Sequence, residues 1–112
     1  MRIYENKNNL AIYTQSVFAF LRKIPKGKVV TYKIVAQVCG LINPRNVSWV
    51  LRQNSGPLKI PCYKVVLSNG HLAQGYKFGG PREQARYLKA DGITVNKKNC
   101  IKDFKKHLWL GE

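Results

Sequence analysis

The chain has 112 residues, 45% of them hydrophobic, and carries 20 Lys and Arg against 5 Asp and Glu, a formal net charge of +15. This composition excludes a disordered chain, and no apolar run approaches the roughly 20 residues that span a bilayer. The polar start of the chain also lacks the apolar core of a signal peptide. We therefore expect a single cytoplasmic, monomeric domain over 1–112, without a membrane partner, with an N-terminal extension at 1–12 and a basic C-terminal tail at 96–112.

The first half of the chain has three helical patterns. The first begins at Thr14, a candidate N-cap, and ends before Pro25. Thr31 is the expected N-cap of the second helix, and Gly40 lies just beyond its end. Pro44 suits the first position of a third helix, which we expect to end near residue 54.

The second and third helices form a helix-turn-helix pattern. Arg45 opens the second helix of this pair and Arg52 closes it, where a recognition helix meets DNA. No Asp or Glu occurs between Glu5 and Glu83, and such an excess of positive charge attracts polyanions. Two alternatives exist: the helix pair is a core hairpin whose arginines are merely exposed, or the positive charge attracts an anionic membrane. The charge distribution favours nucleic acid.

The second half of the chain has shorter elements that alternate with turns. Together with the helical pair they predict an α+β fold class: a single small winged-helix-like domain, in which a short strand or hairpin carries Pro61 and Cys62. In chain order we expect a strand at 59–66, a hairpin-type turn at 68–70, a glycine-bounded loop at 75–80, a helix from Pro81 to Asp91 and a last short helix within 101–109.

Three cysteines are present, Cys39, Cys62 and Cys100, with wide spacings and no Cys-x-x-Cys pair. This pattern predicts neither a zinc site nor a disulfide framework. His71 and His107 do not complete a metal-ligand spacing. We expect no metal ion.

The segment Pro61-Cys62-Tyr63-Lys64-Val65-Val66 resembles the Pro-Cys-His-Arg-Val active-site motif of the O6-alkylguanine-DNA alkyltransferases. The resemblance extends from about Thr14 to Ile93, in the order and approximate spacing of the C-terminal, DNA-binding and catalytic domain of that family. The other matching stretches are 25–32, 44–47, 52–54, 75–76, 79–80 and 91–92.

The resemblance implies that Cys62 accepts the alkyl group of O6-alkylguanine in double-stranded DNA, once, without a cofactor. The lesion is hidden in the base stack, so the nucleotide must be flipped into a pocket. Arg45 matches the arginine that fills the vacated space, and Tyr32 matches the tyrosine beside the flipped nucleotide. Arg52 lies on the same recognition helix.

Three further positions carry implied roles. Asn54 matches the asparagine that ties the recognition helix to the active-site strand. Val65 matches the valine whose backbone helps to read the guanine edge. Tyr76 and its flanking glycines match the loop that covers the pocket.

Two family residues that activate the cysteine are replaced. The family histidine is Tyr63 here, and counting from Gly79 and Gly80 places the family glutamate at Ala85. A free cysteine is mostly a thiol at neutral pH. We expect the positive charge of Lys64, or a hydrogen bond from the Tyr63 phenol, to favour the thiolate instead.

With these replacements the chain also resembles the alkyltransferase-like proteins. Those proteins bind alkylguanine without transferring the alkyl group and direct it to nucleotide excision repair. The stretch from Gly92 to Trp109 resembles their terminal pattern, whereas retention of Cys62 favours a transferase. Three hypotheses follow: a single-turnover alkyltransferase, a lesion sensor with excision-repair partners, and a DNA binder without lesion recognition.

Overall fold

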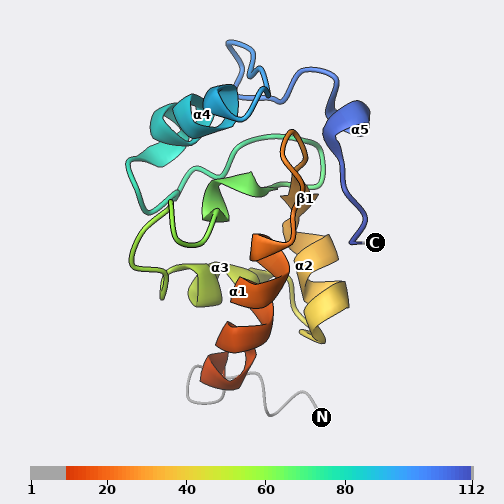
Figure 1. The fold of residues 1–112 in the computed structure, drawn as a ribbon, viewed down its shortest axis with the longest axis vertical. Helices are drawn as coiled ribbons and strands as arrows, with labels where there is room; N and C mark the ends of the chain where they lie inside the picture. The colour runs from red at the N-terminus through yellow and green to blue at the C-terminus, as the bar shows by residue number, and fades with distance from the viewer. Residues whose placement is uncertain (1–9, 112) are drawn as a thin grey trace.

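The computed structural model describes residues 10–111 of the chain, in which three helices and the segment around α4 lie on either side of a two-stranded sheet (Figure 1). Helices α1, α2 and α3 form one part of the domain, and α4 and α5 lie on the other part. In chain order the elements are η2 (Leu10–Tyr13), α1 (Thr14–Arg22), β1 (Val30–Thr31), α2 (Tyr32–Cys39), α3 (Arg45–Leu51), η3 (Cys62–Lys64), β2 (Val65–Val66), α4 (Gly80–Ala90) and α5 (Phe104–His107).

The predicted N-cap of α1 is wrong by one residue. Thr14 is the first helical residue, because the 3-10 helix η2 leads into α1 and Tyr13 is the N-cap without a side-chain hydrogen bond. Residues 1–9 of the predicted extension lie outside the described residues. Its last part belongs to the domain, since Leu10 is only 1% exposed and packs in the core.

The helix-turn-helix prediction is confirmed. The Thr31 hydroxyl accepts a hydrogen bond from the backbone N–H of Ile34 at 3.1 Å, which caps α2. Gly40 ends α2 in the left-handed conformation, with φ of +82°. Pro44 has helical dihedrals directly before α3, and α3 ends at Leu51, earlier than predicted. The following residues continue as a turn.

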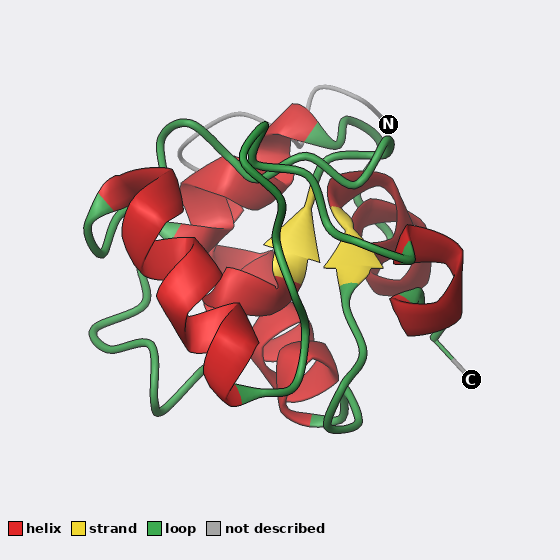
Figure 2. Cartoon of the chain, turned by 90° about the horizontal axis from the view of Figure 1, so that it is seen from above, coloured by secondary structure: helices red, strands yellow, loops and turns green. Residues whose placement is uncertain are grey.

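The strand predicted at 59–66 is wrong for most of its length. Only Val65 and Val66 are extended, and they pair in parallel with Val30 and Thr31. Cys62 begins the short helix η3, because local bonds such as Lys64 N–H to Pro61 O (3.0 Å) replace the bonds of a ladder. The two strands lie side by side at the centre, with helices around them (Figure 2). Cys62 is thus presented by a turn at the start of a buried strand.

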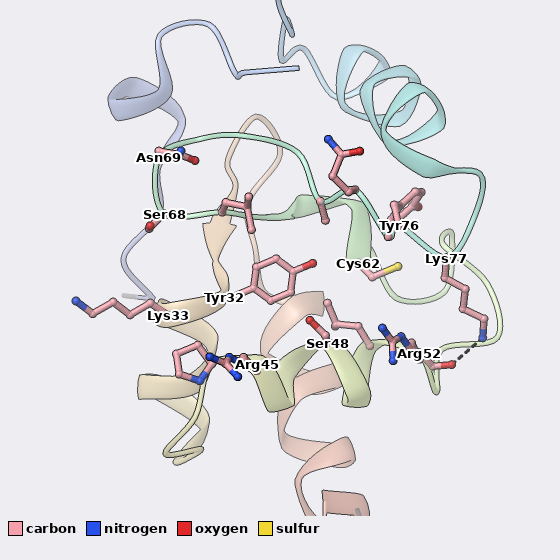
Figure 3. A pocket seen from close by; sticks show the side chains of 16 residues that line it. Tyr32, Lys33, Arg45, Ser48, Arg52, Cys62, Ser68, Asn69, Tyr76 and Lys77 are labelled. Carbon is pink, nitrogen blue, oxygen red and sulfur yellow. Dashed lines mark hydrogen bonds between the residues drawn. The ribbon is translucent and has the colours of Figure 1, made fainter. Parts of the chain in front are cut away.

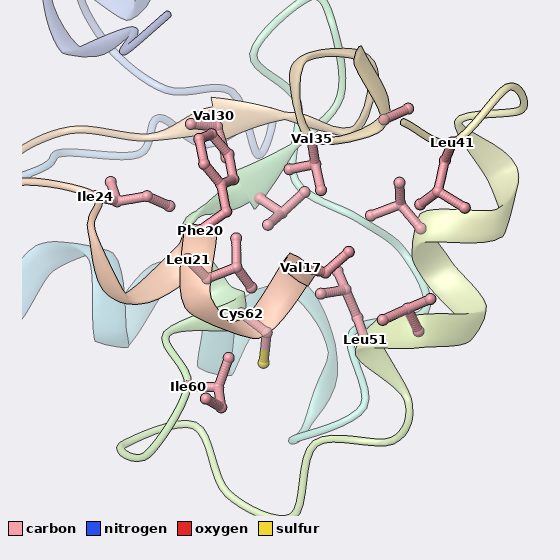
Figure 4. Close-up of a cluster of buried hydrophobic side chains, with 14 of the residues drawn as sticks. Val17, Phe20, Leu21, Ile24, Val30, Val35, Leu41, Leu51, Ile60 and Cys62 are labelled. Carbon is pink, nitrogen blue, oxygen red and sulfur yellow. The ribbon is translucent and has the colours of Figure 1, made fainter. Parts of the chain in front are cut away.

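Two apolar clusters lie on either side of this sheet. The larger one fills the space among α1, α2 and α3, and the buried Cys62 belongs to it (Figure 4). The smaller one contains Val66, with Leu88 of α4 and Ile93. The α+β class expected from the sequence is confirmed. No helix among residues 10–111 is long and apolar enough to cross a membrane.

The predicted C-terminal tail is docked on the domain over its described part, while residue 112 lies outside that part. Val29 N–H donates to His107 O, and Trp109 N–H donates to Val29 O, both at 2.8 Å. The Trp109 ring stacks on Phe20 of α1, with 5.3 Å between ring centroids. The tail therefore adds a strand-like edge to the sheet.

Candidate functional site

A cavity of about 760 Å³ opens between the helix pair α2–α3 and the loop that follows β2. Five residues that the sequence singled out lie along its wall: Tyr32, Arg45, Arg52, Cys62 and Tyr76. They come from distant parts of the chain, and Figure 3 shows Tyr32 and Cys62 pointing into the same space.

Helix α3 forms one wall of the cavity. The Arg45 side chain is exposed at its first turn, where the Arg45 N–H donates to Asn43 Oδ1 at 3.0 Å. Arg52 is exposed at the other end, at the C-cap. Tyr32 begins α2 directly after the Thr31 cap. Burial, and then the nearby Cys62, raise the pKa of the Tyr32 phenol, so it stays protonated and can donate a hydrogen bond.

Cys62 lies on the cavity wall with only 5% of its surface exposed. Its Sγ accepts a hydrogen bond from Asn54 Nδ2 at 3.2 Å. Burial raises the pKa of the thiol above its ordinary value. The Asn54 donor, the Tyr76 hydroxyl and the charge of Lys77 act in the opposite direction without offsetting burial. The free protein therefore presents Cys62 as a thiol at neutral pH.

Asn54 links the end of the helix-turn-helix to the Cys62 segment. Its side chain is 1% exposed, and Nδ2 also donates to Ile60 O at 2.9 Å. Its Oδ1 accepts from Gly56 N–H at 3.2 Å. The three bonds fix the turn between α3 and η3, and with it the position of Cys62.

Tyr63, Lys64 and Val65 do not line the cavity. The expectation that Lys64 favours the thiolate is wrong, since its buried ammonium pairs with Asp91 Oδ2 at 3.0 Å and donates to Pro25 O at 3.1 Å. Tyr63 forms no hydrogen bond with Cys62 among the described residues.

The Tyr63 ring instead stacks on Tyr87 of α4, with 5.3 Å between ring centroids. Val65 is fully buried in β2. These side chains build the support beneath Cys62 rather than the cavity wall.

Helix α4 supplies two residues that the sequence analysis missed. Ala85, the predicted glutamate position, packs against the smaller apolar cluster. The neighbouring Gln84 is fully buried, and its Nε2 donates to Tyr63 O and Val65 O at 3.0 and 3.1 Å. Asp91, which caps α4, is the carboxylate that pairs with Lys64. Gln84 lies one turn before Leu88 on the inner face of α4, and this spacing could have identified it as a buried polar residue.

The loop 73–79, here called the cover loop, forms the wall opposite α3. It carries Tyr76, whose hydroxyl is buried and has no hydrogen-bond partner among the described residues. Burial, and then the nearby Cys62, raise the pKa of this phenol, so it remains a proton donor. Tyr76 lies beside Cys62 (Figure 3).

The charge of the cavity wall is positive. Its ionised groups are Lys33, Arg45, Arg52 and Lys77, and no carboxylate of the described residues lies among the lining side chains. The described residues also contain no group of three or more His, Cys, Asp or Glu that could hold a metal ion. The wall is thus suited to an anionic ligand of appreciable size.

The architecture and the cavity define a small α+β helix-turn-helix domain with a cysteine on the wall of a positively charged cavity. Residues 12–93 match the family described as "6-O-methylguanine DNA methyltransferase, DNA binding domain". The chain belongs to this family, as the resemblance of its motifs predicted.

Named relatives agree with this assignment. The chain is 37% identical over 81 residues to the methylated-DNA–protein-cysteine methyltransferase of Pyrobaculum aerophilum, covering 72% of this chain and 53% of that protein. It is 38% identical over 81 residues to a bifunctional methyltransferase/endonuclease of Picrophilus torridus, covering 71% of this chain and 26% of that protein. The chain thus spans about half the length, or less, of these relatives.

A similar fold occurs in a solved structure of S. pombe Atl1 in complex with damaged DNA containing O6-carboxymethylguanine. The TM-score is 0.74 at 22% identity, and the match covers 88% of this chain and 95% of Atl1. This likeness shows the shared fold.

Proposed function

We propose that the protein is a DNA repair protein that binds double-stranded DNA through α2 and α3, takes O6-alkylguanine into the cavity and transfers the alkyl group to Cys62. The observation that carries this proposal is the position of Cys62 Sγ on the wall of a cavity of about 760 Å³, between α3 and the cover loop. Pockets for small ligands are commonly about 300–1,000 Å³.

The positive residues of α3 support the DNA contact. Arg45 and Arg52 are exposed at the two ends of this short helix, where phosphates or base edges can be reached. Arg45 is free to enter the space that a flipped nucleotide leaves.

The transfer requires one bond to form and one to break. The Cys62 sulfur attacks the alkyl carbon, the bond between that carbon and O6 breaks, and its electron pair returns to guanine. The thiol proton passes to the guanine base, so the products are S-alkylcysteine and unmodified guanine. Because the thioether is stable, each protein molecule reacts once.

A second candidate function is a sensor that binds alkylguanine without transfer and directs it to excision-repair proteins. The raised pKa of Cys62 favours this alternative, because a protonated thiol is a poor nucleophile. The S. pombe Atl1 structure offers a precedent for this fold bound to DNA with O6-carboxymethylguanine.

Intact-protein mass spectrometry separates the two functions. The protein is incubated with a duplex containing one O6-methylguanine, with Cys62→Ala as the control. A gain of one methyl group in the native protein alone supports transfer. Tight lesion binding without a mass gain supports the sensor, and equal affinity for modified and plain duplex contradicts both.

Arg45→Ala tests the flipping role. It should weaken binding to the lesion duplex more than binding to the plain duplex, measured at one salt concentration. Arg22→Ala, which removes an exposed arginine of α1 outside the cavity wall, is the matched control. Equal losses on both duplexes for Arg45→Ala would count against flipping.

A further inference from the structure

Lys77 joins the cover loop to the end of the recognition helix. Its Nζ donates to Arg52 O at 2.7 Å and to Asn54 O at 2.8 Å, two carbonyls that follow the last turn of α3. The carbonyl end of a helix carries partial negative charge and leaves acceptors without intrahelical partners. The Lys77 ammonium, 25 residues from Arg52 in sequence, supplies both a positive charge and the hydrogen-bond donors at this end of the helix.

The cover loop is also bonded to α4. Ala73 N–H donates to Gln84 Oε1 at 3.2 Å, and Gly80 N–H donates to Tyr76 O at 2.9 Å. These bonds connect the loop to α4. Only the Lys77 bonds connect its tip to α3, among the hydrogen bonds found for residues 10–111.

The loop tip carries the group that lies closest to the chemistry. The Tyr76 hydroxyl is buried without a partner, a state that costs free energy unless a ligand or the thiolate receives its hydrogen bond. Tyr76 lies beside Cys62, while the Lys77 side chain runs from the same loop to the Arg52 carbonyl at the end of α3 (Figure 3).

We propose that Lys77 is a positioning residue: by clamping the cover loop to the end of α3, it keeps the unpartnered Tyr76 hydroxyl beside Cys62 Sγ, where it can donate a hydrogen bond once the thiolate forms. The proposal deepens the proposed function and rests on it where lesion binding is concerned. Both Tyr76 and the Lys77 charge lower the pKa of the thiol, against the larger effect of burial.

The first test needs no DNA. The rate of Cys62 alkylation by iodoacetamide is measured against pH and assigned to Cys62 by peptide mass spectrometry. Lys77→Met should move the midpoint upward by about 0.5 to 1 pH unit and slow the reaction at neutral pH about three- to tenfold. Lys77→Arg should restore the native profile within about twofold, because a guanidinium can donate to the same carbonyls.

Lys59→Met is the matched control, since it removes one exposed lysine close to Cys62 in sequence but outside the cavity wall. It should leave the profile unchanged. A Lys77→Met profile that coincides with the native one would overturn the proposal. So would an equal shift in Lys59→Met, because any lost lysine charge would then account for the effect.

The second test asks whether Lys77 acts through Tyr76. The ratio of the dissociation constants for plain and O6-methylguanine duplexes is compared among Tyr76→Phe, Lys77→Met and the double variant. If Lys77 positions Tyr76, the double variant is no less selective than Tyr76→Phe alone. Multiplied losses would overturn that coupling. A native protein without lesion preference would contradict the proposed function. The pH profile of Cys62 alkylation would still test whether Lys77 is a positioning residue.

Discussion

Replacing Asn54 by alanine should destabilise the domain strongly, because one buried side chain closes the turn between α3 and Cys62. The substitution removes the donor to Ile60 O (2.9 Å), the donor to Cys62 Sγ (3.2 Å) and the acceptor for Gly56 N–H (3.2 Å). Since Asn54 is 1% exposed, water does not readily replace these partners.

The magnitude follows from three lost hydrogen bonds. One of them leaves the Gly56 N–H without a partner, whereas Ile60 O keeps its bond from the Cys62 N–H at 2.7 Å. Each lost hydrogen bond of this kind costs about 1 kcal/mol, and an unsatisfied buried partner raises the cost to about 1–3 kcal/mol. We expect a total loss of about 3 kcal/mol in the free energy of unfolding, a large part of the roughly 5–15 kcal/mol of a typical domain.

Urea denaturation measures this loss. The midpoint should fall while the slope of the transition stays constant. Gln53→Ala is the control, because Gln53 is the exposed neighbour whose Nε2 donates to Trp49 O at 3.1 Å. That change should cost at most about 0.5 kcal/mol. A loss below about 1 kcal/mol for Asn54→Ala would refute the view that this side chain determines the turn.

Further outcomes are expected for an ion pair, an aromatic contact and the buried thiol. Asp91→Asn should lower the free energy of unfolding by about 3 kcal/mol in urea denaturation, because it leaves the buried Lys64 ammonium without its counter-charge. The reasoning would be contradicted if Asp91→Asn cost less than a double variant that neutralises both Asp91 and Lys64. Glu83→Gln is the control, because it breaks the exposed ion pair of Glu83 with Arg86 and should leave the urea midpoint unchanged. Trp109→Ala should cost about 3 kcal/mol by removing the ring stacked on Phe20, and an unchanged midpoint would show that the docked segment is dispensable. Because burial raises the pKa of Cys62, the folded state retains a proton that the unfolded state releases. The free energy of unfolding should therefore fall as pH rises above about 8.5. A urea midpoint that stays constant above that pH would be inconsistent with the buried thiol.

Features that depend on neighbouring residues were predictable from the amino-acid sequence. The Thr31 cap and the Gly40 end of α2 rest on interactions within a few residues, so the helix-turn-helix was predicted from local patterns. The family followed from the order of short motifs around Pro61 and Cys62, and residues 12–93 match it. The excess of positive charge is a property of composition alone.

The surroundings of Cys62 were not predictable in this way, because they depend on the folded domain. The segment 59–64 has an apolar pattern typical of a strand, but its backbone bonds close locally as η3, and periodicity does not distinguish the two in so short a run. Lys64 looked like a cation for the thiolate, yet Asp91, far along the chain, pairs with it. The cation beside Cys62 is Lys77, which the cover loop brings there. The contacts of Lys64 with Asp91 and of Lys77 with Asn54 join residues distant in sequence. Burial, which determines their energy and raises the pKa of Cys62, exists only once the chain has folded.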